Sequence, residues 1–222
     1  MRLLNYGSGI FTYLGNTALV AVLSVTFTLA VSIPAGYAFA RFAFPGRTLI
    51  FFAILAVIMV PHASLLVPMY TLLAKIGGTN SIVVLALVYA TFQLPFAVYM
   101  MRNSFESVPR ELDESALVDG CGPLRALWSV LLPIVFPGVV TVGLFAFLAA
   151  WNEFLAPLIF LSSDDKFTLP IALSSVSVGQ MGSVDYGALQ AGITVSVLPC
   201  IIIFVALQKY YVSGLTSGAL KG

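Results

Sequence analysis

Residues 14–40 read LGNTALVAVLSVTFTLAVSIPAGYAFA, a mostly apolar stretch without any Asp, Glu, Lys or Arg. The charged residues that flank it are Arg2 and Arg41. About 20 predominantly apolar residues are enough for a helix to cross the hydrocarbon core of a bilayer, which is about 30 Å thick. The stretch is therefore predicted to be a transmembrane helix.

Four more uncharged gaps follow along the chain, and the shortest of them, residues 186–208, is still 23 residues long. Each gap is long enough to span a bilayer as a helix. A further uncharged stretch, residues 167–184, is rich in serine and glycine, and we expect an extramembrane or re-entrant loop there. We predict one transmembrane domain over residues 11–208 with five helices, at 14–40, 48–70, 80–102, 127–150 and 186–208, followed by a C-terminal tail at 209–222.

The composition of the whole chain agrees with this prediction. Of 222 residues, 60% are hydrophobic and only 9% are charged, and the mean hydropathy is +1.04. A soluble protein carries about 25% charged residues, because its surface must be solvated. The net charge of +1 offers no basic field for phosphates, which excludes a nucleic-acid-binding protein. We therefore predict an all-α, multi-spanning membrane protein.

The Lys and Arg residues in the predicted loops indicate the orientation of the chain, because cytoplasmic loops are enriched in them. If the 41–47 loop is cytoplasmic, seven of the ten Lys and Arg residues lie on that side and three on the other. This places the N-terminus outside and the C-terminus in the cytoplasm. The sequence after Met1 has no signal peptide, so an outside N-terminus implies either a further span upstream or a five-span protein with a short translocated tail.

The loop at residues 102–126 holds eight of the nineteen charged residues of the chain. Within it, Pro109 suits the first turn of a helix, and acidic residues follow where the helix dipole favours them. Gly120 and then Pro123 are a stop signal. We predict a short helix over residues 109–119. Such a helix is too short to be stable alone, so it packs either under its own transmembrane bundle or against a cytoplasmic partner.

The two sides of this predicted helix differ in chemistry. A side of small residues beside a glycine allows another backbone to approach closely, whereas acidic residues mark a second side. The first side carries Leu112, Ser115, Ala116 and Asp119, and the second carries Glu111, Glu114 and Val118.

The segment at residues 114–122, ESALVDGCG, resembles the EAA loop of ABC-transporter permeases. In that pattern Glu-Ala-Ala precedes Asp-Gly, and Ile-x-Leu-Pro follows further along the chain. Here Ser115 replaces the first alanine, and Val130 replaces the isoleucine in VLLP at residues 130–133. Pro137 lies at the position of a second proline in the pattern. The offsets, together with a place between two predicted spans, make the resemblance specific.

Four other segments are similar to maltose-type sugar permeases, so the resemblance covers nearly the whole chain. They are the stretch from Asn16 to Arg41, the turn Pro45-Gly-Arg47, the motif Trp151-Asn-Glu-Phe154 with Pro157-Leu158, and residues 214–222. The family usually has six spans, and its first span has no counterpart here. The resemblance thus implies the permease core of a type I ABC importer without its first helix, in agreement with the orientation argument.

The resemblance implies a transport subunit in the inner membrane of a bacterium or archaeon, with no catalytic residues and no cofactor of its own. A second, homologous permease would complete the translocation path. A dimer of cytoplasmic ATPase subunits would bind ATP and Mg²⁺, and an extracytoplasmic solute-binding protein would deliver the solute. No G-x-x-x-x-G-K-[ST] loop occurs in the sequence, which agrees with a separate ATPase. The short helix would dock on that ATPase through Glu111, Glu114, Ser115, Ala116, Asp119 and Gly120.

Residue types near membrane depth suggest the solute path. Sugar sites combine hydrogen-bonding groups with flat apolar faces. The candidates are Tyr89, Gln93, Trp151, Asn152 and Glu153. Structural alternatives exist for most of them: Trp151 also suits an interfacial anchor, and Glu153 a helix cap. Gln93 suits a bond to carbonyls that the nearby proline frees, and Tyr89 suits packing.

Two other classes of membrane protein are disfavoured. An ion-coupled secondary transporter, the main alternative, needs charged residues inside its spans, and only Glu153 lies at a span border. An integral membrane enzyme needs paired Asp residues, a His cluster or a Ser-based dyad, and His62 is the single histidine. Cys121 and Cys200 lack the spacing of metal ligands and are predicted to be free thiols. No metal site is predicted.

Overall fold

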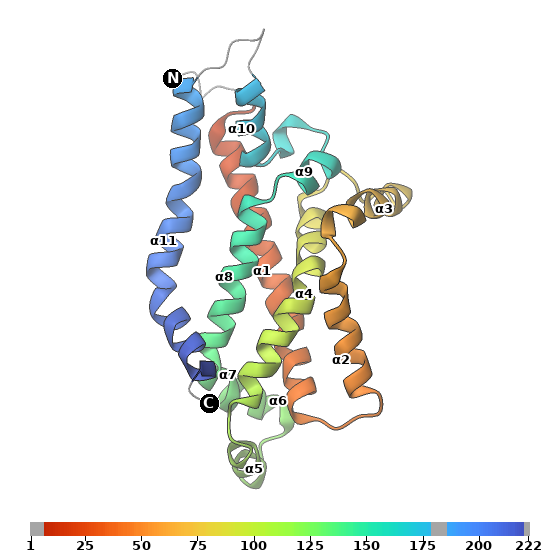
Figure 1. The fold of residues 1–222 in the computed structure, drawn as a ribbon, viewed down its shortest axis with the longest axis vertical. Coiled ribbons are helices and arrows are strands. Elements are labelled where there is room, and N and C mark those ends of the chain that lie inside the picture. Colours follow the sequence, from red (N-terminus) through yellow and green to blue (C-terminus); the bar gives the residue numbers. More distant parts are fainter. Residues whose placement is uncertain (1–6, 179–185, 220–222) are drawn as a thin grey trace. The chain divides into compact units, whose positions relative to one another are not determined.

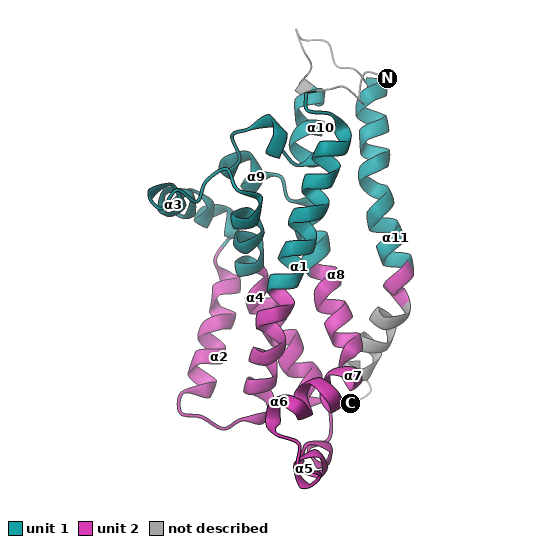
Figure 2. Ribbon diagram, turned by 180° about the vertical axis from the view of Figure 1, so that it is seen from behind, with its two compact units in different colours: residues 1–27, 61–92, 146–205 teal, residues 28–60, 93–145, 206–222 magenta. Residues whose placement is uncertain are grey.

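In a computed structural model of the chain, residues 7–178 and 186–219 are described, and every regular element within them is a helix. Figure 1 shows these helices with their labels. The chain forms two compact units, drawn in different colours in Figure 2. Unit 1 comprises residues 1–27, 61–92 and 146–205, and unit 2 comprises residues 28–60, 93–145 and 206–222.

Unit 1 has a core of apolar side chains from five helices. Its largest cluster includes Val20, Leu66, Leu85, Trp151 and Phe160. The helices that contribute to unit 1 are α1 (Ile10–Arg41, first part), α3 (His62–Lys75), α4 (Ile82–Glu106, first part), α8 (Phe136–Asn152, last part), α9 (Leu155–Phe160), η4 (Asp164–Lys166), α10 (Leu169–Val178) and α11 (Tyr186–Ala219, most of it).

Unit 2 contains the charged loop and the helix ends around it. Its core is built around Tyr37, Met101, Phe105, Leu127 and Leu131. The remaining parts of α1, α4, α8 and α11 belong to it, together with α2 (Arg47–Ala56), η2 (Val57–Met59), α5 (Glu111–Val118), α6 (Pro123–Ala126), the π-helical turn η3 (Leu127–Leu131) and α7 (Leu132–Ile134).

Three helices are long and apolar enough to cross a membrane by themselves, namely α1, α4 and α11 within the described ranges. α1 and α11 contain the ranges 14–40 and 186–208 of the predicted spans, and α4 overlaps the predicted span 80–102 from Ile82 onward. The number rises to five when each of two interrupted helix pairs is counted as one span. α11 continues to Ala219 and so extends into the segment predicted as a tail.

The predicted span 48–70 is not one continuous helix. α2 and η2 end at Met59, and α3 begins at His62. Between them Val60 has an extended backbone, with φ −85° and ψ 120°. The cause is Pro61, because a proline disfavours the helical conformation of the residue before it and has no N–H to donate.

The predicted span 127–150 also differs from the structure. The chain is already helical from Pro123 to Ile134, a stretch that includes the π-helical turn. The helix axis then bends by 80° between this stretch and α8, which begins at Phe136. Pro137 lies in the first turn of α8, where the missing N–H costs nothing. The straight part of this span is therefore α8 alone.

The stretch 167–184, predicted as a loop, forms the helix α10 over Leu169–Val178. Its serines had suggested an extramembrane segment. In the structure two of the hydroxyls are bonded within the helix, since Ser175 Oγ donates to the Ile171 carbonyl and Ser177 Oγ to that of Ser174. Residues 179–185 lie outside the described part of the chain.

Candidate functional site

The short helix of the charged loop is α5, which begins at Glu111 and ends at Val118. Pro109 lies just before the helix and not in its first turn, where it was predicted. The acidic residues Glu111, Asp113 and Glu114 occupy the first turn, where they interact favourably with the helix dipole. No side chain caps this end by a hydrogen bond.

The C-terminal end of α5 is closed by backbone hydrogen bonds, as the glycine signal predicted. Gly120 has φ +78°, a left-handed conformation that favours glycine. The Cys121 N–H donates to the Ala116 carbonyl at 2.9 Å, and the Gly120 N–H donates to Leu117 at 3.0 Å. This pair of bonds is a Schellman motif. Pro123 then opens α6.

Most of the α5 surface is exposed. Val118, the last residue of α5, is 87% exposed, although it is apolar. Ala116 is the buried residue of this helix, and Asp113, three positions earlier, is half-buried on the same side. The predicted side of small residues, which carries Leu112, Ser115, Ala116 and Asp119, is therefore partly buried and partly exposed. Of the predicted docking residues, Ala116 points into unit 2, whereas Glu111, Glu114, Ser115, Asp119 and Gly120 are exposed.

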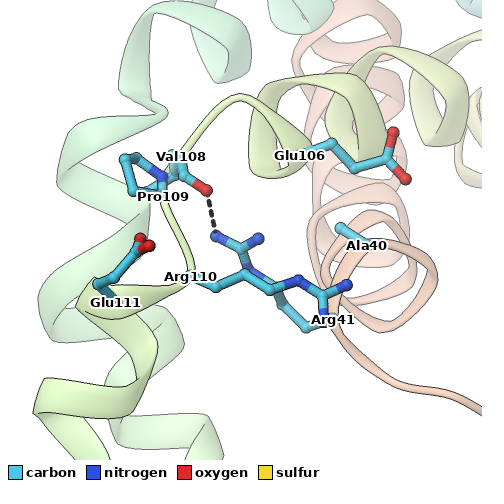
Figure 3. Close-up of a pocket in the computed structure, with 7 residues that line it drawn as sticks. All are labelled: Ala40, Arg41, Glu106, Val108, Pro109, Arg110 and Glu111. Atoms are coloured by element: carbon cyan, nitrogen blue, oxygen red, sulfur yellow. Dashed lines mark hydrogen bonds between the residues drawn. The ribbon is translucent and has the colours of Figure 1, made fainter.

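An ion pair that was not predicted joins α5 to the end of α1. The Arg41 Nε lies 2.8 Å from Oδ2 of Asp113, and the two side chains are only 8% and 16% exposed. Neither this nitrogen nor the two carboxylate oxygens have an aligned hydrogen-bond partner among the described residues, so the contact is one of charge. Arg41 Nη2 donates a hydrogen bond of 2.9 Å to the Val108 carbonyl, which Figure 3 shows.

Burial raises the pKa of the Asp113 carboxyl above its ordinary value. The positive charges of Arg41 and Arg110 act in the opposite direction but do not cancel this effect. A carboxylate at this place therefore depends on its cationic neighbours, because loss of water disfavours the charged form.

Two clefts flank Arg41 in unit 2. The first, shown in Figure 3, has a volume of about 520 Å³. The second, of about 180 Å³, lies on the side of Tyr37 and Pro123. Arg41 and Arg110 line both. The first is lined by Ala40, Arg41, Glu106, Val108, Pro109, Arg110 and Glu111, and the second by Tyr37, Arg41, Phe42, Arg110, Asp113, Glu114, Leu117, Pro123 and Ala126.

A second charged cluster joins α2 and α4 near the first cleft. The Arg102 Nε lies 2.8 Å from Oε1 of Glu106, and Arg47 Nη2 lies 3.6 Å from the same oxygen. The Arg102 guanidinium also lies 4.1 Å from the centre of the Phe51 ring. These side chains are more exposed than the Arg41–Asp113 pair, and water weakens their attraction accordingly.

The predicted solute-path residues Trp151 and Glu153 lie in unit 1 and have intramolecular partners. The Trp151 ring is buried and stacked on Phe147, and its Nε1–H donates to the Ser196 carbonyl at 3.0 Å. Oε1 of Glu153 accepts from the backbone N–H groups of Leu155 and Ala156, at 3.0 and 3.2 Å. Glu153 thus caps α9, the helix that follows it.

Tyr89 is buried beside Glu153, and its hydroxyl has no hydrogen-bond partner among the described residues. His62 Nε2 lies 3.9 Å from the Glu153 Oε2, and the His62 side chain is 57% exposed. The exposed Asn152 donates to the Leu148 carbonyl at 2.8 Å. Gln93 belongs to unit 2. In the described residues, no group of three or more His, Cys, Asp and Glu side chains is placed to hold a metal ion.

Residues 32–217 match the family described as binding-protein-dependent transport system inner membrane component. The match covers most of the chain, and the chain belongs to this family. The protein is therefore a multi-pass inner membrane permease subunit of the ABC transporter class. The resemblance deduced from the charged loop and its flanking motifs is confirmed.

Curated relatives agree with the family assignment. The chain is 38% identical to the sulfoquinovosyl glycerol transport system permease protein SmoH of Agrobacterium fabrum, over 95% of this chain and 73% of that protein. It is 34% identical to the trehalose/maltose transport system permease protein MalG of Thermococcus litoralis, over 95% and 75%. It is 35% identical to the diacetylchitobiose uptake system permease protein DasC of Streptomyces coelicolor, over 96% and 76%.

Solved structures share the fold. A bacterial ABC transporter involved in the import of the acidic polysaccharide alginate matches with a TM-score of 0.79 and 24% identity, over 90% of this chain and 75% of that one. The MetNI methionine ABC transporter, in an inward-facing conformation, matches with a TM-score of 0.69 and 18% identity, over 96% and 97%. The predicted all-α permease fold is confirmed by these matches.

Proposed function

We propose that this chain is a permease subunit of an ATP-driven, binding-protein-dependent importer of sugars or sugar-like solutes. The relatives SmoH, MalG and DasC carry names of systems for a glycosyl glycerol, for disaccharides and for an amino-sugar disaccharide. They support a solute that is rich in hydroxyl groups. The observation that carries the proposal within this chain is the helix α5, which has the EAA-like sequence and exposes the acidic side chains of Glu111 and Glu114.

In this proposal the chain forms the translocation path together with a second, homologous permease. A dimer of cytoplasmic ATP-binding subunits holds ATP and Mg²⁺, and an extracytoplasmic solute-binding protein delivers the solute. The orientation with α5 and the C-terminus in the cytoplasm is supported by the excess of Lys and Arg on that side. This chain binds no nucleotide, and energy reaches it through α5.

α5 is suited to dock in a cleft of the ATPase. An eight-residue helix gains little stability from its own hydrogen bonds, so contacts with another surface must order it. Leu117 and Val118 are exposed apolar side chains that a partner would cover. Glu111 and Glu114 are exposed acids that would meet basic side chains of the ATPase. Charge complementarity of this kind sets the orientation of a docked helix.

The solute path is proposed to run past Tyr89 and Glu153. The buried Tyr89 hydroxyl has a free donor and acceptor, and a sugar hydroxyl is a suitable partner for it. Glu153 keeps its second oxygen, Oε2, toward His62, while the first caps α9. Trp151 supports this wall through packing, because its indole N–H is already bonded to Ser196. Asn152 and Gln93 are further polar groups of the proposed path.

The docking proposal is tested with two variants of the exposed loop, Gly120→Arg and Glu114→Lys. The first places a side chain at a left-handed position and the second reverses an exposed charge, so both should abolish co-purification of the ATPase and ATP-driven uptake. A charge reversal at the exposed Asp165, Asp165→Lys, is the matched control and should leave association unchanged. Wild-type ATPase association and uptake in both loop variants would refute the docking role.

The solute class is tested by uptake of radiolabelled maltose, trehalose and diacetylchitobiose into vesicles that contain the complete importer. Glu153→Gln should lower uptake while ATPase association is unchanged, because α5 is not altered. Accumulation of none of the three disaccharides would argue against this solute class without affecting the docking proposal.

A further inference from the structure

We propose that Arg41 is a positioning residue that clamps α5 and the segment before it to the end of α1, so that the loop and α1 move together. This inference rests on the proposed coupling function of α5. It adds a residue outside the loop, on a transmembrane helix, to the parts that transmit movement of the ATPase.

One guanidinium holds two points of the loop. Nε of Arg41 contacts the Asp113 carboxylate in the first turn of α5, and Nη2 donates to the Val108 carbonyl just before that helix. Arg41 is itself the last residue of α1. The Nη2 hydrogen bond fixes a direction, whereas the contact of Nε with Asp113 is one of charge and holds the two groups close together. The planar guanidinium can make both contacts at once because its donors point in different directions. Lysine has a single ammonium group and cannot reproduce this geometry.

α5 also packs against η3 and α6, which follow it in the chain, but these contacts do not tie it to α1. Ala116 is the only residue of this fully described helix that is buried, and a methyl group contributes little apolar burial. The Ser115 hydroxyl donates to the Glu111 carbonyl in its own helix and so adds no attachment to α1. The hydroxyl of Tyr37 on α1 donates a long bond of 3.4 Å to the Pro123 carbonyl, beyond the end of α5.

Burial distinguishes this ion pair from an ordinary surface pair. Exposed pairs are weak and exchange readily with water. Arg41 and Asp113 are largely shielded, so separating them would leave a charge in a poorly solvated place. The raised pKa of the Asp113 carboxyl is consistent with that shielding. The clamp therefore opposes separation of α5 from α1 during the transport cycle.

The test uses the complete importer, with both permeases, the ATPase and the solute-binding protein, and the disaccharide that the wild type accumulates. The measured quantity is uptake per ATP hydrolysed. In Arg41→Met and Asp113→Asn this ratio should fall, by about tenfold or more for Arg41→Met, because one partner of a shielded pair is left uncompensated. Arg41→Lys should recover part of the loss. Glu106→Gln, which neutralises a more exposed carboxylate of the same unit, is the matched control and should keep the ratio.

A merely structural role would reduce the amount of complex and lower uptake and ATP hydrolysis together, with an unchanged ratio. That result would overturn the inference. A second measurement uses spin labels at the exposed Ala43 and at the exposed Leu112 of α5, which is not among the proposed docking residues, after replacement of both native cysteines. The distance distribution should broaden in Arg41→Met. An unchanged distribution would likewise overturn it.

The two proposals fail in different ways. If Glu114→Lys loses the ATPase while Arg41→Met keeps a wild-type ratio, α5 docks but Arg41 does not clamp it. If Glu114→Lys and Gly120→Arg both keep the ATPase, the docking proposal itself is wrong.

Discussion

Replacement of Gly36 by alanine should destabilise the protein, because α1 and α4 approach each other too closely at this point for a methyl group. An ideal Cβ at Gly36 would lie 2.5 Å from Met101 Cβ, 2.8 Å from the Arg102 backbone nitrogen and 2.9 Å from the Met101 carbonyl carbon. Two of these neighbours are backbone atoms, which cannot rotate away. An ideal Cβ at Gly15, in the same helix, would meet no neighbouring atom within 4 Å, so Gly15 is the matched control.

The magnitude follows from the displacement that the methyl group requires. Ordinary contact begins at 3.4 Å, so the backbone of α4 must retreat by 3.4 − 2.5 = 0.9 Å. A gap of that size forfeits about a quarter to a half of the dispersion attraction of the surrounding contacts, and overpacking typically costs about 1–3 kcal/mol. The greater helix propensity of alanine returns about 0.5–1 kcal/mol. The net loss expected for Gly36→Ala is about 1–2 kcal/mol, whereas Gly15→Ala should gain about 0.5–1 kcal/mol.

Thermal unfolding of the purified complex in detergent measures both variants. For a chain of this size each kcal/mol changes Tm by about 2–4 °C, so Gly36→Ala should lower Tm by roughly 2–8 °C. Gly15→Ala should leave Tm unchanged or raise it slightly. Equal shifts of the same sign in the two variants would refute the reasoning, because the two sites differ only in the closeness of the neighbouring helix.

Three further predictions concern loops outside the spans. In Arg41→Met, Asp113 keeps only Arg110 as a cationic neighbour. Protonation of the carboxyl then limits the penalty to about 4 kcal/mol at pH 7 and about 2 kcal/mol at pH 5.5. Because the pKa of this carboxyl is raised, stability of the loop increases as the pH falls. The protection of the α5 amides against hydrogen exchange, relative to an unstructured peptide at the same pH, should therefore increase in the variant on acidification. The pKa of Asp164 is lowered by hydrogen bonds from the Ser8 and Tyr13 hydroxyls, so these contacts persist above the ordinary pKa and are lost as the pH falls through the lowered one. The protection of amides near residue 8 against hydrogen exchange, relative to an unstructured peptide at the same pH, should fall only in strong acid. Asn80 has φ +55°, and Asn80→Ala should lower Tm more than Asn80→Gly, by a difference of about 1–2 kcal/mol in unfolding free energy, because only alanine is strained there.

The end of α5 could be predicted from the sequence because its signals are local. Gly120 adopts the left-handed conformation, and two backbone bonds within the same turn close the helix. Pro123 begins the next helix, as its missing N–H permits. Such features involve residues a few positions apart, so neighbouring sequence is sufficient to indicate them.

The structure differs from the sequence-based prediction at Pro61, where the helix is interrupted, and at α10, where a loop was expected. Uncharged residues continue through Pro61, so the distribution of charges predicts one continuous span where the backbone is in fact interrupted. In α10 the serines read as polar, but a serine hydroxyl that donates to a carbonyl of its own helix is compatible with burial of the opposite side. The buried apolar residues of α10 are Leu169, Ile171, Ala172 and Val176.

The predicted solute-path residues show a related limit. Residue type suggested Trp151 and Glu153 for the solute path, but it did not show whether their polar groups are available to a solute. The Trp151 indole is bonded to a residue 45 positions later, Ser196, and one oxygen of Glu153 is occupied by the α9 backbone. Availability of a polar group depends on its partners, and those are set by tertiary packing.

By itself, the sequence determined that the chain spans a membrane, and it predicts that residues 102–126 form the main aqueous loop. A charged group is costly in hydrocarbon wherever it lies in the fold, so the placement of charges along the chain was sufficient. Only the tertiary structure decided which of the acidic residues in that loop loses its water. Asp113 pairs with Arg41, 113 − 41 = 72 residues earlier, because the end of α1 and the first turn of α5 meet in unit 2. That meeting depends on helix packing, and no local pattern distinguishes Asp113 from the acids beside it.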